Sequence, residues 1–151
     1  MTIDNVGGPS VISNNSAGRS GGGLWLNHPN TTSTISKVTF SGNGAGDDGG
    51  AIRLGSSTPG NVLNVSFSRF VSNTASSGKA SGLSVCNGNA TATNNWWGCS
   101  TGPSAAPCDG SSTRPPARPV RWAPARSMLR PGCGSTSPRR RTRWSPAKAP
   151  A

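Results

Sequence analysis

A two-part motif that recurs about every 30 residues constrains this chain more than any other feature. Its first half, Phe40-Ser41-Gly42-Asn43, returns 30 residues later as Phe70-Val71-Ser72-Asn73, and Val11-Ile12-Ser13-Asn14 precedes it by 29 residues. Its second half is a Gly-rich step into a short apolar segment. That step occurs at residues 22–26, 49–54 and 81–85. Repetition at this period is typical of folds in which each unit packs only on its neighbours.

Within each unit the apolar residues alternate with polar ones. Leu63, Val65 and Phe67 are separated by Asn64 and Ser66, a period of two that indicates short strands with one buried face. No segment has the 3.6-residue period of a helix. The supply of core residues is small, at 31% hydrophobic with 21 Gly, which suits stacked rungs that need few inward side chains. We therefore predict an all-β fold, a right-handed parallel β-helix (solenoid), which the apolar register favours over a disordered Gly/Ser/Asn-rich linker.

The repeat register predicts which side chains stack. Phe40 should lie on Phe70, and the apolar residues after the Gly-rich steps should lie on one another. Those residues are Leu24, Ile52 and Leu83. Asn14, Asn43 and Asn73 should form an amide ladder, because Asn tolerates the left-handed conformation that a tight corner needs and identical amides can stack.

The composition changes abruptly near residue 112. Residues 1–112 hold all four acids, five bases and all 13 Asn, whereas residues 113–151 hold nine Arg, Lys148 and no acid. We therefore predict an incomplete β-helix over 1–112 and a disordered Arg/Pro/Ala-rich tail over 113–151. The tail has two interpretations. It either binds polyanions such as nucleic acid non-specifically, or it results from GC-rich DNA translated out of frame.

The motif resembles the repeats of a known family. Phe40-Ser41-Gly42-Asn43 followed by Gly49-Gly50-Ala51-Ile52 is similar to the paired repeat of chlamydial polymorphic outer-membrane proteins, whose autotransporter passenger regions are right-handed parallel β-helices. Asn94-Asn95-Trp96-Trp97-Gly98, followed by Gly102-Pro103, is similar to segments that close β-helices of the pectin-lyase-like class. The resemblance covers about residues 1–110 and implies a fold more than a function, because this fold hosts adhesins, lyases and hydrolases.

Catalytic, metal and cofactor sites are not indicated. Asp47-Asp48 is the only acidic pair, and no carboxylate aligns with it in the neighbouring repeats, so we interpret it as a solvated turn. His28 is the only histidine, and its neighbours are typical of a surface loop. We predict no catalytic residue, no metal ligand and no cofactor.

The cysteines and tryptophans offer alternatives. Cys99 and Cys108 flank a Gly/Pro-containing loop, a spacing that favours a disulfide over a zinc site. Cys86 is interpreted as a candidate buried thiol, and the states of Cys86 and Cys133 stay open. Trp96-Trp97 is either a sugar-stacking platform or, as we favour, a cap over the end of the core.

Function follows from fold and resemblance together. We expect a non-catalytic secreted or cell-surface segment, associated with a bacterial outer membrane, that presents its turns to other surfaces or glycans. The alternative is a remnant of a polysaccharide lyase or glycosidase. The N-terminus carries no export signal and no stretch is long and apolar enough to span a membrane as a helix, so we expect that the natural ends of the protein lie outside this chain.

Overall fold

The computed structural model describes residues 1–4, 7–55, 60–103 and 107–114. All regular secondary structure in these residues is β-strand. The strands are short: β1 (Thr2–Ile3), β2 (Ser10–Ser13), β3 (Ser16–Ala17), β4 (Leu24–Leu26), β5 (Thr32–Ser36), β6 (Val38–Ser41), β7 (Gly44–Ala45), β8 (Ile52–Gly55), β9 (Asn61–Ser66), β10 (Arg69–Val71), β11 (Leu83–Cys86), β12 (Gly88–Thr93) and β13 (Ser111–Arg114). Over the same residues, no helix is of a length and hydropathy that could cross a bilayer.

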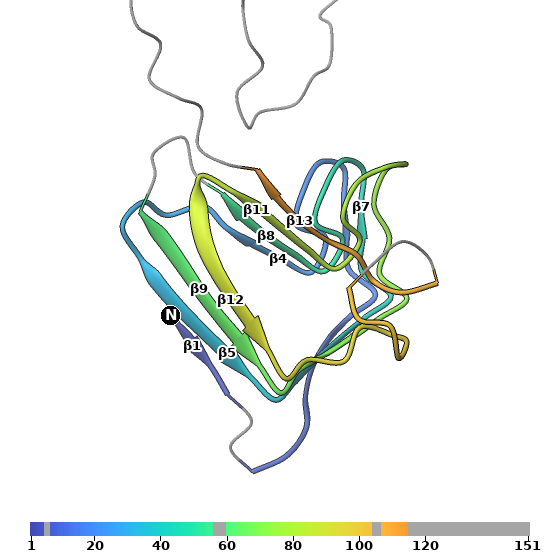
Figure 1. Ribbon diagram of the computed structural model, residues 1–151, viewed down its shortest axis with the longest axis horizontal. Helices are drawn as coiled ribbons and strands as arrows, with labels where there is room; N and C mark the ends of the chain where they lie inside the picture. Colours follow the sequence, from blue (N-terminus) through green and yellow to red (C-terminus); the bar gives the residue numbers. More distant parts are fainter. Residues whose placement is uncertain (5–6, 56–59, 104–106, 115–151) are drawn as a thin grey trace, which may run out of the picture.

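The strands stack as a parallel β-solenoid (Figure 1). Three main sheets form its faces, with strand orders β1-β5-β9-β12, β2-β6-β10 and β4-β8-β11-β13. A fourth, two-stranded sheet joins β3 to β7. Every pairing is parallel, so the chain visits the faces in turn and returns one level further along the axis. The predicted all-β solenoid is confirmed.

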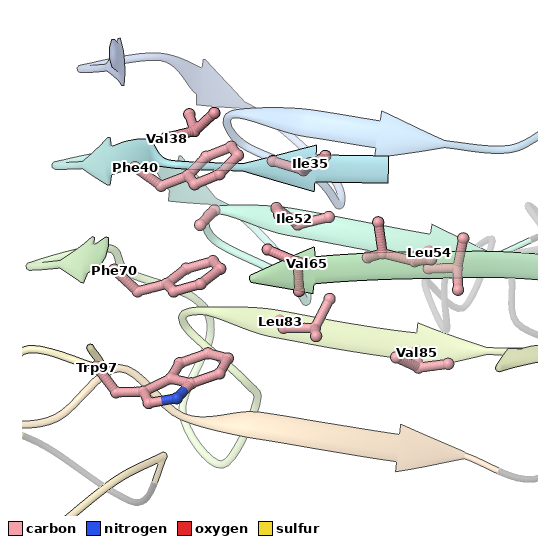
Figure 2. Close-up of a cluster of buried hydrophobic side chains, with 12 residues drawn as sticks. Ile35, Val38, Phe40, Ile52, Leu54, Val65, Phe70, Leu83, Val85 and Trp97 are labelled. Carbon is pink, nitrogen blue, oxygen red and sulfur yellow. The ribbon is translucent and has the colours of Figure 1, made fainter. Parts of the chain in front are cut away.

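The core is a set of columns in which each side chain lies on its counterpart in the next turn (Figure 2). Phe40 pairs in register with Phe70, and their rings stack with centroids 5.3 Å apart. Ile52 stands between Leu24 and Leu83 in the sheet opposite. Both predicted stacks are therefore confirmed. Fully burying an aliphatic or aromatic side chain stabilises a fold by about 1.5–3 kcal/mol, so these columns supply much of the driving force.

The first repeat was aligned one residue out of register. Ile12, not Val11, pairs with Phe40, and Val11 is exposed. The next residues shift accordingly, so Asn14 occupies a left-handed corner (φ 56°) and Asn15 takes the place in the ladder that was predicted for Asn14. The spacing between these two turns is 28 residues, and the alternation of Val11 with Ile12 gave no sign of which one faces inward.

Phe67 is a second correction. The alternation of Leu63 and Val65 predicted it inside the core, yet it is 62% exposed. Strand β9 ends at Ser66, and Phe67 adopts a left-handed conformation (φ 49°). Lys37 and Asn94 follow the matching strands β5 and β12 with the same conformation, so this is the corner at which every described turn changes face. A left-handed residue breaks the in/out alternation, which is why Phe67 points outward.

Candidate functional site

A polar ladder runs along the solenoid beside the aromatic column. Asn15 Nδ2 donates to Asn43 Oδ1 at 3.0 Å, and Asn43 Nδ2 donates to Asn73 Oδ1 at 2.9 Å. Asn73 Nδ2 then donates to Asp109 Oδ2 at 2.6 Å. Each acceptor oxygen of the Asn pairs also receives a backbone N–H, as in the bond from Asn43 N to Asn73 Oδ1 (3.0 Å). The amides therefore satisfy the backbone at successive corners, which is the structural use of a buried polar network.

Asp109 ends this ladder and was missed by the sequence reasoning. Its side chain is only 2% exposed. Burial raises the pKa of its carboxyl group, while hydrogen bonds from Asn73 and Ser81 oppose the rise. Asp109 lies in the closing loop, where no repeat motif marks its position, so the one available signal was its place directly after Cys108.

Asp48 is not the solvated residue that was expected. Its Oδ2 accepts from Arg53 Nη1 at 2.8 Å, and both side chains are largely buried. Its Oδ1 accepts the backbone N–H groups of Gly49 (3.0 Å) and of Ala80 (3.1 Å) in the next turn. Arg53 Nη1 also donates to Ser84 Oγ at 2.7 Å. The Asp48 carboxylate therefore stabilises the Gly-rich corner in which it lies. Both of its oxygens accept hydrogen bonds within that corner or from the next turn.

Asp47 does match the expectation of an exposed turn residue. Lys79 Nζ lies 3.9 Å from its Oδ1, and both side chains are well exposed. Ser20 Oγ lies 3.5 Å from its Oδ2. Ser20 and Lys79, from the turns on either side, are therefore the neighbours of this acid. Within residues 1–4, 7–55, 60–103 and 107–114, no group of three or more His, Cys, Asp or Glu side chains is arranged to hold a metal ion.

The closing loop is held by a disulfide. Cys99 is bonded to Cys108, with Cα atoms 5.3 Å apart. The bond places Asp109 beside Trp97, whose carbonyl accepts the Asp109 N–H at 2.8 Å.

Cys86 is buried and also disulfide-bonded, so its interpretation as a thiol is wrong. Strand β13 runs across the predicted boundary at residue 112, and residues 115–151 of the predicted tail, including Cys133, lie outside the described residues.

The two adjacent tryptophans have different environments. Trp97 is buried and stacks on Phe70 with centroids 4.3 Å apart, so it continues the Phe40–Phe70 column into the last turn (Figure 2). Trp96 is 42% exposed, and the Arg69 guanidinium carbon lies 4.7 Å from the centre of its ring. Trp97 thus covers the core, while its neighbour Trp96 belongs to the candidate contact surface.

A pocket of about 220 Å³ opens where the sheet of β4 and β8 meets the sheet of β5 and β9. Its lining includes His28 and Trp25, which sequence reasoning did not associate with a site. Asn61 also lines it, 1% exposed, and neither Nδ2 nor Oδ1 of its amide has a hydrogen-bond partner. A buried amide without a partner is costly and calls for a physical explanation.

Comparison with known proteins supports the repeat interpretation. Residues 37–54 match the model of the Chlamydia polymorphic membrane protein (Chlamydia_PMP) repeat. This segment spans β6, β7 and the start of β8, and it contains Phe40, Asn43 and the Asp48–Arg53 pair. No match was found to a curated protein or to a solved structure.

Proposed function

We propose that this chain, a β-solenoid repeat protein resembling polymorphic membrane protein passenger repeats, is a non-catalytic, adhesin-like segment. It contacts other surfaces or glycans through its corners. The observation that carries the proposal is the division of side chains between inside and outside. The inward residues are committed to stacking, while large aromatic residues face solvent: Trp25 (49% exposed), Phe67 (62%) and Trp96 (42%).

Exposed aromatic side chains are common in binding surfaces. They supply a large apolar area at a small cost in side-chain entropy, and indole faces suit the C–H faces of sugars. Trp96 is further organised by Arg69, which holds a cation over one ring face. The column of left-handed corners presents Phe67 between Lys37 and Asn94, so an apolar ring is flanked by polar groups.

The alternative function is a remnant of a polysaccharide lyase or glycosidase. Glycoside hydrolysis needs two carboxylates facing one substrate, and polysaccharide-active enzymes of this fold also gather carboxylates on adjacent turns to bind Ca²⁺. In the described part of the chain, Asp48 is bound to Arg53 and to backbone N–H groups, and Asp109 is buried at the end of the amide ladder. These arrangements favour a structural role for Asp48 and Asp109 and leave Asp47 as the exposed acid of the pair, so we rank the enzyme second.

The proposed location is the cell surface, in association with a bacterial outer membrane. This part of the proposal rests on the family of the matched repeat. Binding of polyanions by the basic residues beyond 114 is a weaker alternative, supported by their number alone.

Adhesion of the full chain tests the proposal. Beads coated with the protein should retain glycan-bearing cells, and the double variant Trp96→Ala/Phe67→Ala should retain several-fold fewer. Asn64→Ala, a change at an exposed strand residue, is the matched control and should bind as the parent does. Equal retention by all three would contradict a contact role for the corners.

Turnover assays on pectins and other acidic glycans, with and without Ca²⁺, test the enzyme alternative. We expect no product above background. Turnover that disappears with Asp47→Asn would reverse the ranking of the two functions.

A further inference from the structure

Four large side chains gather on the outer surface of the corner between the sheet of β5 and β9 and the sheet of β6 and β10. Lys37 and Phe67 occupy the left-handed corner position in successive turns, with φ 54° and 49°. Two residues after Phe67, Arg69 begins β10 and pairs with Trp96 in the next turn. All four side chains are exposed, and we call this group the basic corner. Successive turns are about 4.8 Å apart, so one ligand can reach the whole group.

The backbone beneath the basic corner is fixed by hydrogen bonds. Trp96 donates its N–H to the Ser68 carbonyl at 2.9 Å, and its own carbonyl accepts the Phe70 N–H at 2.8 Å. Inside the same corner, Asn95 Oδ1 accepts the Ser68 N–H at 2.9 Å, and Asn95 Nδ2 donates to the Val65 carbonyl at 2.9 Å. The outward side chains therefore project from a preorganised frame, which lowers the ordering cost of binding.

Arg69 is oriented by Trp96. Its guanidinium carbon lies 4.7 Å from the centre of the indole ring, which is the arrangement of a cation–π contact. This contact uses one face of the guanidinium and leaves the N–H groups at its edge available; among the described residues they donate to none. These N–H groups form a planar fork that matches the two oxygens of a carboxylate. Arg69 can therefore bind an anion in a defined orientation.

The two cations of the basic corner have no paired carboxylate among the described residues. The chain has four acidic side chains, all Asp and all in its described part. Three are engaged away from this corner, in the two ion pairs and the buried ladder described above. The fourth, Asp4, accepts from Ser36 Oγ at 2.5 Å on the neighbouring sheet and forms no ion pair with Lys37 or Arg69. The basic corner is thus complementary to an anionic ligand that also has an apolar face.

A carboxylated sugar of an acidic glycan has both of these features. Its carboxylate fits the Arg69 fork, and the C–H face of its ring suits the exposed ring of Phe67. Lys37, beside Phe67 in the preceding turn, would add a charge contact for the next acidic residue of the glycan. A neutral sugar would use the rings alone, and an inorganic anion would use the cations alone.

We propose that the basic corner is a binding site for carboxylated sugars, in which the Arg69 guanidinium holds the carboxylate and Phe67 packs on the sugar ring. This rests on the proposed surface function, because it names the ligand class of that surface. Trp96 is a positioning residue, since it orients Arg69 by stacking and need not contact the sugar.

Titration of the full chain with trigalacturonate at physiological salt tests the proposal. We expect saturable binding with a Kd in the millimolar range. The fully methyl-esterified trisaccharide, which has the same rings without the charge, should bind about tenfold more weakly, because it offers Arg69 no carboxylate. Backbone amide NMR of the isotope-labelled protein locates the site, and the signals of Phe67, Arg69 and Trp96 should shift on binding.

Charge-matched variants separate the basic corner from the other bases of the chain. Arg69→Gln should weaken binding about tenfold, because it removes the charged hydrogen bonds to the carboxylate. Arg19→Gln removes one exposed charge elsewhere on the solenoid and should change binding by less than about twofold. Arg69→Lys keeps the charge without the fork and should weaken binding severalfold. Trp96→Ala should also weaken it severalfold, and Trp96→Phe, which keeps an aromatic face for Arg69, should restore most of the loss.

Three results would overturn the proposal. The first is the absence of saturable trigalacturonate binding. The second is equal weakening by Arg69→Gln and Arg19→Gln, or unchanged binding in Arg69→Lys, because binding would then follow charge alone. The third is tighter binding, with the same NMR shifts, of a thymidine oligonucleotide of equal charge, which would identify the basic corner as a nucleic-acid surface.

Cell retention judges the surface function separately. Retention that depends on Trp96 and Phe67, without trigalacturonate binding, keeps the surface function and rejects the ligand class. Trigalacturonate binding that depends on Arg69, without any cell retention, rejects the surface function alone.

Discussion

The ladder of Asn side chains ends at Asp109, so its last member is a carboxyl group and not an amide. Burial raises the pKa of this group in the folded protein, so the native state holds the proton more tightly than the unfolded chain. The stability contributed by Asp109 is therefore fully present below its unfolded-state pKa and is lost as the pH rises through its folded-state pKa. Above the folded-state pKa of Asp109 the ionised carboxylate is retained at a cost, which the donors from Asn73 and Ser81 reduce.

Asp109→Asn should remove that cost. Its Oδ1 can accept from Asn73 as Asn73 Oδ1 accepts from Asn43, and its Nδ2 can donate to the Ser81 hydroxyl oxygen. We expect the melting temperature to rise by a few degrees at pH 7 and the gain to shrink toward pH 3. Thermal unfolding followed by circular dichroism across this pH range measures it. A variant that is less stable than the parent at pH 7 would mean that the charge itself holds the loop.

The ladder should be energetically important at its middle member. Asn43→Ala deprives the Ile12 carbonyl, the Asn15 backbone N–H and the Asn73 amide oxygen of a partner. Leaving buried polar groups unsatisfied should lower the free energy of unfolding by about 2 kcal/mol or more. Asn64→Ala, at an exposed position, should change it by less than about 0.5 kcal/mol. Urea denaturation compares the two, and equal effects would contradict a role for the ladder.

Residue positions were predictable from the sequence only where the repeat marked them. Asn43 and Asn73 share a motif and a spacing with Phe40 and Phe70, and both pairs were assigned correctly. Asn15 and Asp109 belong to the same ladder but have no matching motif around them. Their positions depend on the number of residues in each corner, and the repeat period does not give that number.

At the scale of elements, the aromatic column connects three turns of the solenoid. Phe40, Phe70 and Trp97 stack with interplanar angles of 9° at each contact. Trp97 was expected to cap the core, but its membership of the Phe column was not recognised. The bridge from Arg69 to Trp96 sets a spacing of 27 residues, whereas Phe40 and Phe70 are 30 apart. Trp97 is not a Phe and does not follow at a spacing of 30 residues, so the repeat motif did not identify it as the third ring of the column.

Removing the central ring should destabilise both neighbouring turns. Phe70→Ala leaves a cavity between Phe40 and Trp97, and we expect a loss of about 3–5 kcal/mol in the free energy of unfolding. Phe67→Ala, three residues away at an exposed corner, should lose less than about 0.5 kcal/mol. Guanidinium denaturation of the three proteins checks this. If Phe67→Ala were as destabilising as Phe70→Ala, the corner residue would have a packing role that its exposure does not suggest.

The whole molecule has an uneven distribution of charge. Residues 1–112 carry a net charge of +1, and ten further bases follow without an acid. We expect the full chain to bind heparin and unrelated oligonucleotides alike, with an affinity that falls steeply as salt rises, because binding releases condensed counterions. Fluorescence anisotropy over a salt series measures this. A strong preference for one oligonucleotide at physiological salt would indicate a selected recognition element.

The parallel stacking of turns also determines how the molecule responds to force. Hydrogen bonds between turns run along the solenoid axis, so tension applied along that axis opens them one level at a time instead of shearing a whole sheet. Each turn of about 30 residues that peels away lengthens the chain by roughly 100 Å. The Cys99–Cys108 disulfide reduces the length gained when the last turn opens, because it prevents the chain between the two cysteines from being extended. Such a molecule would extend under flow in discrete steps, each step dissipating work while the remaining turns keep their shape.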